Sequence, residues 1–491
     1  MAYCFGDSFD LYAAVAELIA GYWEGATIAG VAFVAGRFGG QALSINNANG
    51  SQVPSKTSAV NDAIHHFVVA FRQTAALSGT TAGVYIQLID GATNQCAVVF
   101  RSDGAILLTS GGPTGTTLAT YASAVTLQNQ WFAFEIEVVV NNTTGSFTVR
   151  KNGNTSNDFT LGSLNTRSSA NNYANKITIG MSSAVNAQQI DDFLWRSDAS
   201  SVPWVGDIRC YTRMPASDAA VQFTRIPVTQ SVAVVSGTSP AIAAGTARYT
   251  APLTAPCDCS IGTVVVSLAS GYTGNMKCSL FASSGAGPLA VLGSATPISN
   301  PATGSNTFTF PTPVTLSKGT QYIVGFDSDT SSGTWSATTP STGYNSTTAY
   351  ASFPTASPVT TGAQPQIVCT ITTTPTTNNS LVNEPQQDGT TTYVYDSNVN
   401  DADLYGIASI GVTPASTVAV TTRGFLQKSD AGSRSGAVQL KSGATTVNSG
   451  SAALSTTWAW MWRTDTTDPA TSAAWTATGA NNVQIGPVLT A

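Results

Sequence analysis

The run WFAFEIEVVV at 131–140 is followed by the turn sequence NNTTG at 141–145 and by FTVRKNG at 147–153. Successive side chains of a β-strand point to opposite faces of the sheet. Phe134, Ile136 and Val138 therefore share one face, and Glu135 and Glu137 share the other. The Asn-Gly pair that ends the second run is typical of a tight turn between antiparallel strands. The stretch predicts a strand pair with an apolar inner face and a solvated polar face.

The composition of the whole chain favours the same kind of structure. Only 9% of the residues are charged, against the roughly 25% usual in soluble globular proteins, whereas 42% are hydrophobic. Threonine suits a half-solvated strand, and Gly, Asn and Ser suit turns. A helical protein would normally carry Glu, Lys and Arg on its solvent face. We therefore expect an all-β protein, with one short helix predicted by apolar spacing within residues 11–23.

The chain is long enough for several domains, because 491 residues exceed what one hydrophobic core usually serves. Strand-like runs separated by Gly-, Pro- and Ser-rich turns fall into three segments, and a Thr- and Asn-rich linker at 372–380 joins the last two. We expect domains at residues 1–225, 226–375 and 376–491. No fixed-period repeat and no heptad pattern is found, so neither a solenoid nor a coiled-coil stalk is predicted.

Charge and apolar patterns argue against two classes of partner. The formal net charge is −6 and there is no basic run, whereas phosphate binding needs clustered Lys and Arg, so no nucleic-acid partner is expected. No stretch approaches the roughly 20 apolar residues that cross a bilayer, so no membrane insertion is expected. The N-terminal sequence lacks the basic and apolar regions of a secretory signal, which predicts synthesis in a cytoplasm without the general secretory route.

The seven cysteines are odd in number and scattered, which is typical of free buried thiols in a reduced compartment. Cys257 and Cys259 form a C-x-C pair without a histidine nearby, whereas a zinc site would need C-x-x-C units or histidines. A disulfide within the middle region stays open as the alternative. The cysteines of that region are Cys257, Cys259, Cys278 and Cys369.

Several motifs resemble one known group of proteins. Those of the first segment are DSFD at 7–10, GRFGGQAL at 36–43, the Trp131 strand, VRKNG at 149–153, DDFL at 191–194 and GDIR at 206–209. They resemble the concanavalin-A-like, or laminin-G-like, domains of bacteriophage and prophage virion proteins. The sequences DAGSR at 430–434 and TDPATSAAWT at 467–476 resemble the closing sandwich of that family. The middle segment resembles a jelly-roll module inserted between them.

The resemblance implies an N-terminal concanavalin-A-like jelly-roll sandwich followed by two smaller, jelly-roll-like β-sandwiches. It implies a component of the virion surface, such as a tail fibre, a head fibre or a decoration protein, which assembles in the cytoplasm of the host bacterium and leaves by lysis. The first hypothesis is an adhesin that binds a bacterial surface polysaccharide. The alternative is a purely structural subunit that contacts only other virion proteins. A homo-oligomer, by analogy a trimer, is expected.

Catalysis is the least favoured hypothesis. Concanavalin-A-like folds also host glycoside hydrolases, whose motif E-x-D-x-x-E places carboxylates on one face of a strand. Glu135 and Glu137 share a face, but the third position is Val140. His65 and His66 are adjacent, so in a strand they point to opposite faces. We predict no catalytic residue and no enzyme activity. A polysaccharide depolymerase is the third and least favoured hypothesis.

Metal binding is considered because lectin-like domains often hold calcium through Asp and backbone oxygens. Asp90, Asp103, Asp191 and Asp192 fall at expected strand ends or turns. Turn aspartates are usually plain turn residues, and no Asp-x-Asp-x-Asp loop is found. The prediction is no metal and no cofactor.

Six aromatic residues are the candidate glycan-binding groups, because aromatic faces attract the apolar edges of sugar rings. Trp458, Trp460 and Trp462 alternate in a strand-like run and share one face, which forms either a binding platform or, as we favour, the core of a small sandwich. The other three stand in a Ser-, Thr-, Gly- and Pro-rich stretch, where an aromatic either contacts a ligand or plugs the end of a sandwich. They are Trp335, Tyr344 and Tyr350.

Overall fold

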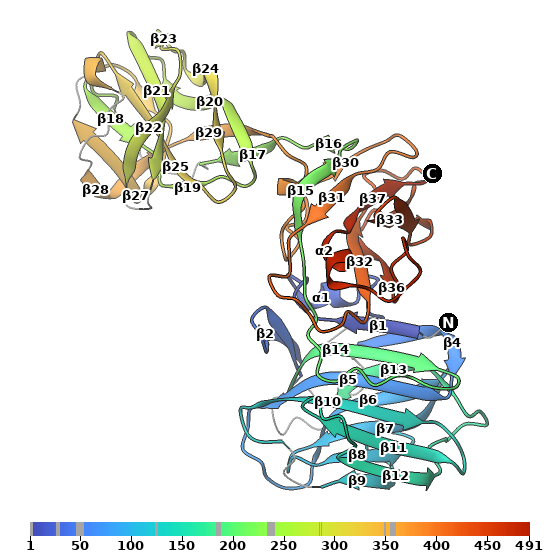
Figure 1. The fold of residues 1–491 in the computed structure, drawn as a ribbon. Coiled ribbons are helices and arrows are strands. Elements are labelled where there is room, and N and C mark those ends of the chain that lie inside the picture. The colour runs from blue at the N-terminus through green and yellow to red at the C-terminus, as the bar shows by residue number, and fades with distance from the viewer. Residues whose placement is uncertain are drawn as a thin grey trace. The chain divides into compact units, whose positions relative to one another are not determined.

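A computed structural model of the protein describes residues 3–25, 30–45, 54–122, 126–182, 188–232, 241–283, 285, 287–347, 350–353 and 360–491. The regular secondary structure of the described chain is almost entirely β-strand, which confirms the expected fold class; its α-helices are the short α1 (Val15–Leu18) and α2 (Ala477–Asn481). The chain divides into two compact units (Figure 1). Unit 1 contains Met1–Met214, Glu384–Gln387 and Asn398–Ala491, and unit 2 contains Pro215–Asn383 and Asp388–Ser397. Most of the first and third expected domains thus lies in one compact unit.

The N-terminal part of unit 1 is a sandwich of two antiparallel sheets, as was expected. The first sheet has the order β12 (Phe159–Leu164), β11 (Gly145–Lys151), β10 (Trp131–Val139), β5 (Ile64–Gln73), β14 (Gln188–Asp198), β3 (Gln41–Ile45) and β2 (Val31–Ala35), and β1 (Tyr3–Asp7) also pairs with β14. The second has the order β4 (Ser55–Asp62), β13 (Ala174–Met181), β6 (Ala82–Asp90), β7 (Thr93–Arg101), β8 (Ile106–Ser110) and β9 (Thr117–Tyr121).

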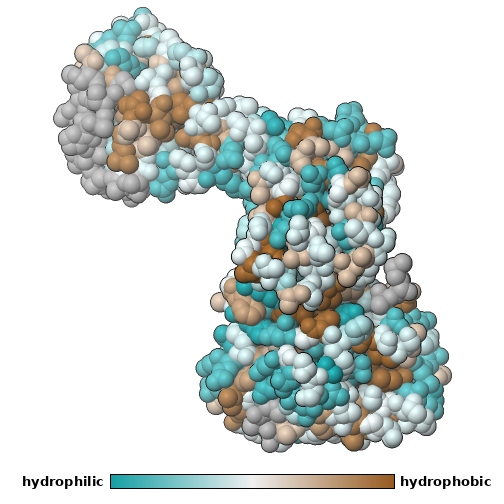
Figure 2. Space-filling model, viewed as in Figure 1, coloured by the Kyte–Doolittle hydropathy of each residue, from teal (hydrophilic) through white to brown (hydrophobic). Residues whose placement is uncertain are grey.

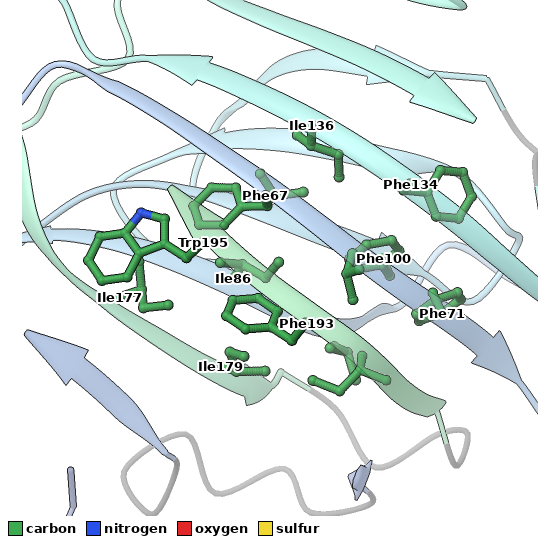
Figure 3. Packing of buried hydrophobic residues seen from close by; sticks show 14 of the residues in the cluster. Phe67, Phe71, Ile86, Phe100, Phe134, Ile136, Ile177, Ile179, Phe193 and Trp195 are labelled. Atoms are coloured by element: carbon green, nitrogen blue, oxygen red, sulfur yellow. The ribbon is translucent and has the colours of Figure 1, made fainter. Parts of the chain in front are cut away.

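The core of this sandwich lies where the alternating apolar side chains of the two sheets meet (Figure 3). Phe134, Ile136 and Val138 of β10 are fully buried, as the alternation predicts. Phe71 of β5 stacks on Phe100 of β7 across the two sheets, with 4.3 Å between ring centroids. Burying a large apolar side chain stabilises a fold by roughly 1.5–3 kcal/mol, so these aromatic side chains contribute to the stability of the sandwich together with the aliphatic ones.

The segment predicted as a helix forms only the single turn α1. Tyr22 and Trp23 are instead fully buried in the sandwich. The Tyr22 hydroxyl donates a hydrogen bond to the Gly6 carbonyl, and Trp23 Nε1–H donates to Asp7 Oδ2 at 2.7 Å. α1 ends at Leu18, and Gly21 farther along has φ +105°, which is not a helical conformation. The near-helical spacing therefore reflects aromatic anchors on the sandwich.

The C-terminal part of unit 1 is a small β-structure that packs on the N-terminal sandwich. One of its sheets contains β31 (Leu404–Ile407), β37 (Gln484–Leu489), β33 (Ser435–Ser442), β34 (Thr445–Asn448) and β35 (Ala452–Ala453), and the other pairs β32 (Val420–Leu426) with β36 (Ala459–Asp465). Trp462 of β36 lies against the sandwich core, and Lys56 Nζ is 4.3 Å from its ring centroid. The backbone N–H of Trp460 donates to the Ala20 carbonyl at 2.6 Å. These contacts join the two parts of unit 1.

Unit 2 is a second sandwich with its own apolar core. One sheet has the order β17 (Val228–Ser231), β29 (Cys369–Pro375), β20 (Cys259–Ser270) and β24 (Gly304–Leu316), with β26 (Thr334–Trp335) on β20. The other has the order β22 (Pro288–Ser294), β21 (Asn275–Ser283), β25 (Gln321–Ser328), β18 (Thr246–Tyr249), β27 (Ala337–Thr347) and β28 (Thr360–Ile367), with β19 (Leu253–Thr254) on β25 and β23 (Ile298–Ser299) on β21. Its remaining elements are β15 (Pro215–Ala220), β16 (Thr224–Arg225), η1 (Tyr350–Ser352), η2 (Asn379–Leu381) and β30 (Val394–Tyr395).

Candidate functional site

Four of the N-terminal motifs meet at one pocket of unit 1. The pocket has a volume of about 130 Å³ and contains three carboxyl groups. Its walls come from the segment after β1, the turn between β2 and β3, strand β14 and the segment after β14. The residues of these walls are 8, 10, 38–40, 191–192 and 209–212. We call it the carboxylate pocket. Its lining residues lie up to some 200 positions apart in the sequence.

The turn between β2 and β3 closes one side of the carboxylate pocket. The backbone N–H of Arg37 donates to Asp191 Oδ2, and that of Gln41 donates to Asp10 Oδ1, both at 2.7 Å. Gly40 has φ +66°, and a Cβ at this position would lie 2.0 Å from Asp10 Oδ1. Only glycine combines this backbone conformation with so close an approach. The geometry of the pocket wall thus requires glycine at position 40, within the GRFGGQAL motif at 36–43.

Asp192 has the most unusual environment in the carboxylate pocket. It lies at an irregularity of β14, where the pairing with β5 shifts register between Asp191 and Leu194, and its φ is +46°. Its Oδ1 accepts the backbone N–H of Cys210 at 2.7 Å. Its Oδ2 is buried without a hydrogen-bond partner in the described part of the chain, and Arg37 Nη1 is 3.9 Å from it. A buried acceptor without a hydrogen-bond partner lowers the stability of the fold by about 1–3 kcal/mol. A ligand that donates a hydrogen bond to this oxygen would recover that loss.

Burial and mutual repulsion raise the pKa values of the pocket carboxyls. Desolvation, with the charge of Asp191, raises the pKa of Asp192 to about 7. Desolvation, with a smaller contribution from Asp10, raises the pKa of Asp191 to about 6, and desolvation also raises the pKa of Asp10. Arg37 compensates these charges only in part, because its guanidinium binds both carboxylate oxygens of Asp207, at 2.7 and 2.6 Å.

The rim of the carboxylate pocket is aromatic. Phe38 is 49% exposed and Tyr211 is 36% exposed, so both rings contact solvent. The Arg209 guanidinium carbon lies 4.7 Å from the ring centroid of Phe38 and 4.4 Å from that of Tyr211. Such cation–π contacts orient the rings at the mouth of the pocket. The site therefore combines acidic acceptors inside with apolar ring surface at its edge.

We expect the pocket carboxyls to destabilise the protein as the pH rises from about 4 to about 7. Their folded pKa values lie above the unfolded values, so the folded state binds more protons in this window and its stability falls with rising pH. Urea unfolding near pH 5 and near pH 7.5 should show that Asp192→Asn loses less stability over this range than the wild type, by on the order of 2 kcal/mol.

The comparison with the variant is needed because two buried histidines act in the opposite direction. Desolvation lowers the pKa of His65 to about 4 and that of His66 to about 3. The folded protein therefore loses stability as the pH falls below about 6.5, because the histidines gain protons more readily in the unfolded state. Both proteins share this contribution. The same pH dependence in wild type and variant would contradict the expected effect of Asp192.

The structure corrects the assignment of two candidate glycan-binding aromatics. Trp335 is 1% exposed, and its ring centroid lies 5.9 Å from that of Phe326 in the core of unit 2. Tyr344 is also buried. Neither ring offers a face to a sugar in this structure, because both fill the sandwich. Tyr350 is half-buried, with Lys277 Nζ 4.2 Å from its ring centroid, and its binding role stays a prediction.

The tryptophans of the C-terminal run have packing partners within unit 1. Trp460 and Trp462 are partly buried against the core of the N-terminal sandwich, and Trp462 lies 5.4 Å from Tyr22 between ring centroids. Trp458 stacks on Phe425, with 5.6 Å between centroids and 11° between ring planes. This arrangement corresponds to the core alternative for the tryptophan run, although the core involved belongs to the N-terminal sandwich.

Glu135 lies beneath the segment after β14 and not on the solvated face that the alternation predicted. Its carboxylate accepts the backbone N–H groups of Val205 at 2.5 Å and Gly206 at 2.9 Å, and His66 Nε2 is 3.2 Å from Oε1. Glu137 is half-buried. Burial raises the pKa of both glutamates. Glu135 therefore tethers the segment that continues into the wall of the carboxylate pocket.

The other features considered from the sequence have local structural partners. Asp90 Oδ2 accepts from Ser169 and Asn171, each at 2.8 Å, and Asp103 pairs with Arg101. Within the ranges that the structure describes, no group of three or more His, Cys, Asp or Glu side chains is arranged to hold a metal ion. All seven cysteines are free thiols. Among the described helices, none is long and apolar enough to cross a bilayer.

Comparison with known proteins identifies similar folds only. No protein-family model matches the chain, and no curated protein matches it. Cellulose-induced protein Cip1 is similar in structure over 37% of this chain and 94% of its own, with 14% identity and a TM-score of 0.28. A carbohydrate esterase of the Shiga toxin-encoding bacteriophage phi24B is similar over 36% of this chain and 90% of its own (13% identity, TM-score 0.27). Caenorhabditis elegans galectin LEC-6 is similar over 32% and 96% (15% identity, TM-score 0.21).

Proposed function

We propose that this protein is a surface component of a bacteriophage-type particle and binds a bacterial surface glycan at the carboxylate pocket. The observation that carries the proposal is the environment of Asp192. Its buried Oδ2 has no hydrogen-bond partner in the described part of the chain, and the residue lines the carboxylate pocket. A ligand with hydrogen-bond donors would satisfy this oxygen.

The chemistry of a sugar matches both parts of the site. Sugar hydroxyls donate to carboxylate oxygens, and hydrogen bonds to charged groups contribute about 1.5–3 kcal/mol each. The apolar C–H edges of a sugar ring pack on aromatic faces such as those of Phe38 and Tyr211 at the rim. Concave sites that combine a few convergent polar groups with aromatic surface are typical of small-ligand binding.

The placement on a phage particle rests on the sequence motifs. The motifs that resemble phage virion proteins include DSFD at 7–10 and GRFGGQAL at 36–43. The same motifs supply Asp10 and Gly40, whose close contact shapes the carboxylate pocket. A low-charge surface with few basic residues also suits an extracellular particle. The proposed function is thus adhesion, without a chemical step on the glycan.

Binding of the purified chain to intact cells and extracted polysaccharides of several candidate hosts tests the proposal, with released sugar ends scored in the same assay. We expect selective binding without release. Asp192→Asn replaces the unpartnered oxygen with an amide group of nearly the same size, and Asn tolerates a positive φ. This variant should bind at least about tenfold more weakly, since a charge-assisted hydrogen bond is lost.

Asp198→Asn is the matched control, because it removes the same charge from a solvent-accessible position of the same strand. It should bind like the wild type. Unchanged binding by Asp192→Asn, or an equal loss in both variants, would contradict the assignment of the pocket. Released reducing ends would instead support a depolymerase.

A purely structural subunit is the second candidate function, and strand β22 favours it. β22 is the edge of its sheet, carries no charged residue, and exposes Leu289, Val291 and Leu292 by 47%, 36% and 39%. Figure 2 shows apolar surface on the visible face of unit 2, to which β22 belongs. An uncharged apolar edge is prone to strand pairing, and two copies of β22 can pair without opposing like charges. Under this alternative the isolated protein forms a defined oligomer and does not bind cells.

A further inference from the structure

The hydrogen bonds of the pocket carboxylates leave their negative charge uncompensated. Asp10 Oδ1, Asp191 Oδ2 and Asp192 Oδ1 each accept a backbone N–H at 2.7 Å, from Gln41, Arg37 and Cys210 respectively. A backbone N–H satisfies an oxygen atom but adds no positive charge. These bonds therefore hold three carboxylates in about 130 Å³ without neutralising them.

The two nearby arginines have other partners. Arg37 binds Asp207 through both terminal nitrogens, and its closer contact to Asp192 is 3.9 Å. Arg209 lies over the rings of Phe38 and Tyr211 at the rim, and its Nη2–H donates to the Phe38 carbonyl at 3.4 Å. Neither guanidinium forms a close pair with a carboxylate of the pocket. Desolvation by burial is the main cause of the raised pKa values of Asp191 and Asp192, and the neighbouring carboxylates add to it.

We infer that the carboxylate pocket selects a sugar that carries a free ammonium group, as a de-N-acetylated hexosamine does; this inference rests on the proposed function. An ammonium group supplies three N–H donors together with a positive charge, and charge-assisted hydrogen bonds are roughly twice as strong as neutral ones. The unpartnered Oδ2 of Asp192 is the acceptor that such a group would meet. A neutral hydroxyl supplies a donor without the charge, and a carboxylated or phosphorylated sugar is repelled.

A divalent metal ion is a less suitable occupant. Calcium takes six to eight oxygen ligands, commonly several carboxylates. In the described residues, no group of three or more acidic, His or Cys side chains has the arrangement that would hold an ion. Asp10 and Asp192 each use one carboxylate oxygen to accept a backbone N–H, and Asp191 uses both of its oxygens in this way. The uncompensated charge therefore suits a small organic cation better than a metal ion that needs many oxygen ligands.

Isothermal titration calorimetry of the full chain at neutral pH tests this selectivity. The probes are a glucosamine oligomer with free amines, the N-acetylated oligomer of equal length, and calcium chloride. We expect the free-amine oligomer to bind at least about tenfold more tightly than the acetylated one. Asp192→Asn should abolish this difference, and Asp198→Asn, which removes the same formal charge, should retain it.

The outcomes separate this inference from the proposed function. Equal affinity for both oligomers, lost in Asp192→Asn, would overturn the ammonium preference and leave the glycan pocket in place. Calcium binding that depends on Asp192 would replace the ammonium by a metal ion. No binding of the free-amine oligomer by a chain that binds host cells would also overturn the inference. Host polysaccharide binding that Asp192→Asn leaves unchanged would overturn both proposals.

Discussion

Replacing Arg423 by alanine is expected to lower the free energy of unfolding by about 3–5 kcal/mol, because it leaves a buried carboxylate without its cation. Arg423 reaches from β32 into the N-terminal sandwich of unit 1. Its Nη2–H donates to Asp7 Oδ1 at 3.1 Å and to the Gly6 carbonyl at 3.0 Å, and its Nη1–H donates to the Tyr12 hydroxyl at 3.1 Å. Its guanidinium carbon lies 3.4 Å from the ring centroid of Tyr22.

Urea unfolding followed by tryptophan fluorescence measures this loss. Arg423→Lys should recover only part of it, because lysine keeps the charge but cannot reproduce the fork of hydrogen bonds and the stacking. Arg434→Ala is a suitable control, since the hydrogen bond of its side chain is to the adjacent Ser433 carbonyl, and it should change the stability by no more than about 0.5 kcal/mol. A loss below about 1 kcal/mol for Arg423→Ala would show that this ion pair does not join the two parts of unit 1.

Gly40→Ala is expected to weaken glycan binding by more than about tenfold while the sandwich stays folded. The added Cβ would lie 2.0 Å from Asp10 Oδ1, so either the carboxylate or the turn must move. A positive φ adds a strain of roughly 1–2 kcal/mol for alanine. The side chain that the added Cβ displaces is Asp10, which lines the pocket. The loss of binding should therefore exceed what the small loss of stability explains.

Gly79→Ala separates the strain from the contact. Gly79 has φ +65°, close to that of Gly40, but a Cβ there would have no atom within 4 Å. Binding and unfolding of the two variants are compared directly. Gly79→Ala should lose a similar amount of stability and bind normally. Normal binding by Gly40→Ala would show that the turn between β2 and β3 does not shape the ligand site.

The periodicity of the sequence predicts the sandwich well. The alternation in WFAFEIEVVV places Phe134, Ile136 and Val138 in the core, because side-chain direction in a strand depends only on local geometry. The same rule does not say what covers the other face. Glu135 is buried by the segment at 205–206, some 70 positions later in sequence, so its environment is a tertiary property.

The site could be predicted only in part. The motifs that build the carboxylate pocket can be found in the sequence, because they resemble those of a known family. No local sequence pattern shows, however, that Asp10, Asp192 and Tyr211 line the same pocket. The irregularity of β14 that gives Asp192 its positive φ depends on pairing with β5. Two of the aromatics chosen from the sequence, Trp335 and Tyr344, are buried, and local sequence does not show this either. A polar, Gly-rich context predicts a loop, whereas Trp335 lies in a two-residue strand that pairs with β20.

Hydrogen–deuterium exchange of the full chain, with and without a polysaccharide from a host whose cells it binds, tests whether the carboxylate pocket is the glycan site. The predicted result is slower exchange in peptides that cover residues 36–41, 190–193 and 207–212, because these segments carry the backbone N–H groups that hold the pocket carboxylates. Asp192→Asn should show no such protection. Protection confined to unit 2, or bound polysaccharide that leaves these three segments unchanged, would contradict a glycan site at the carboxylate pocket.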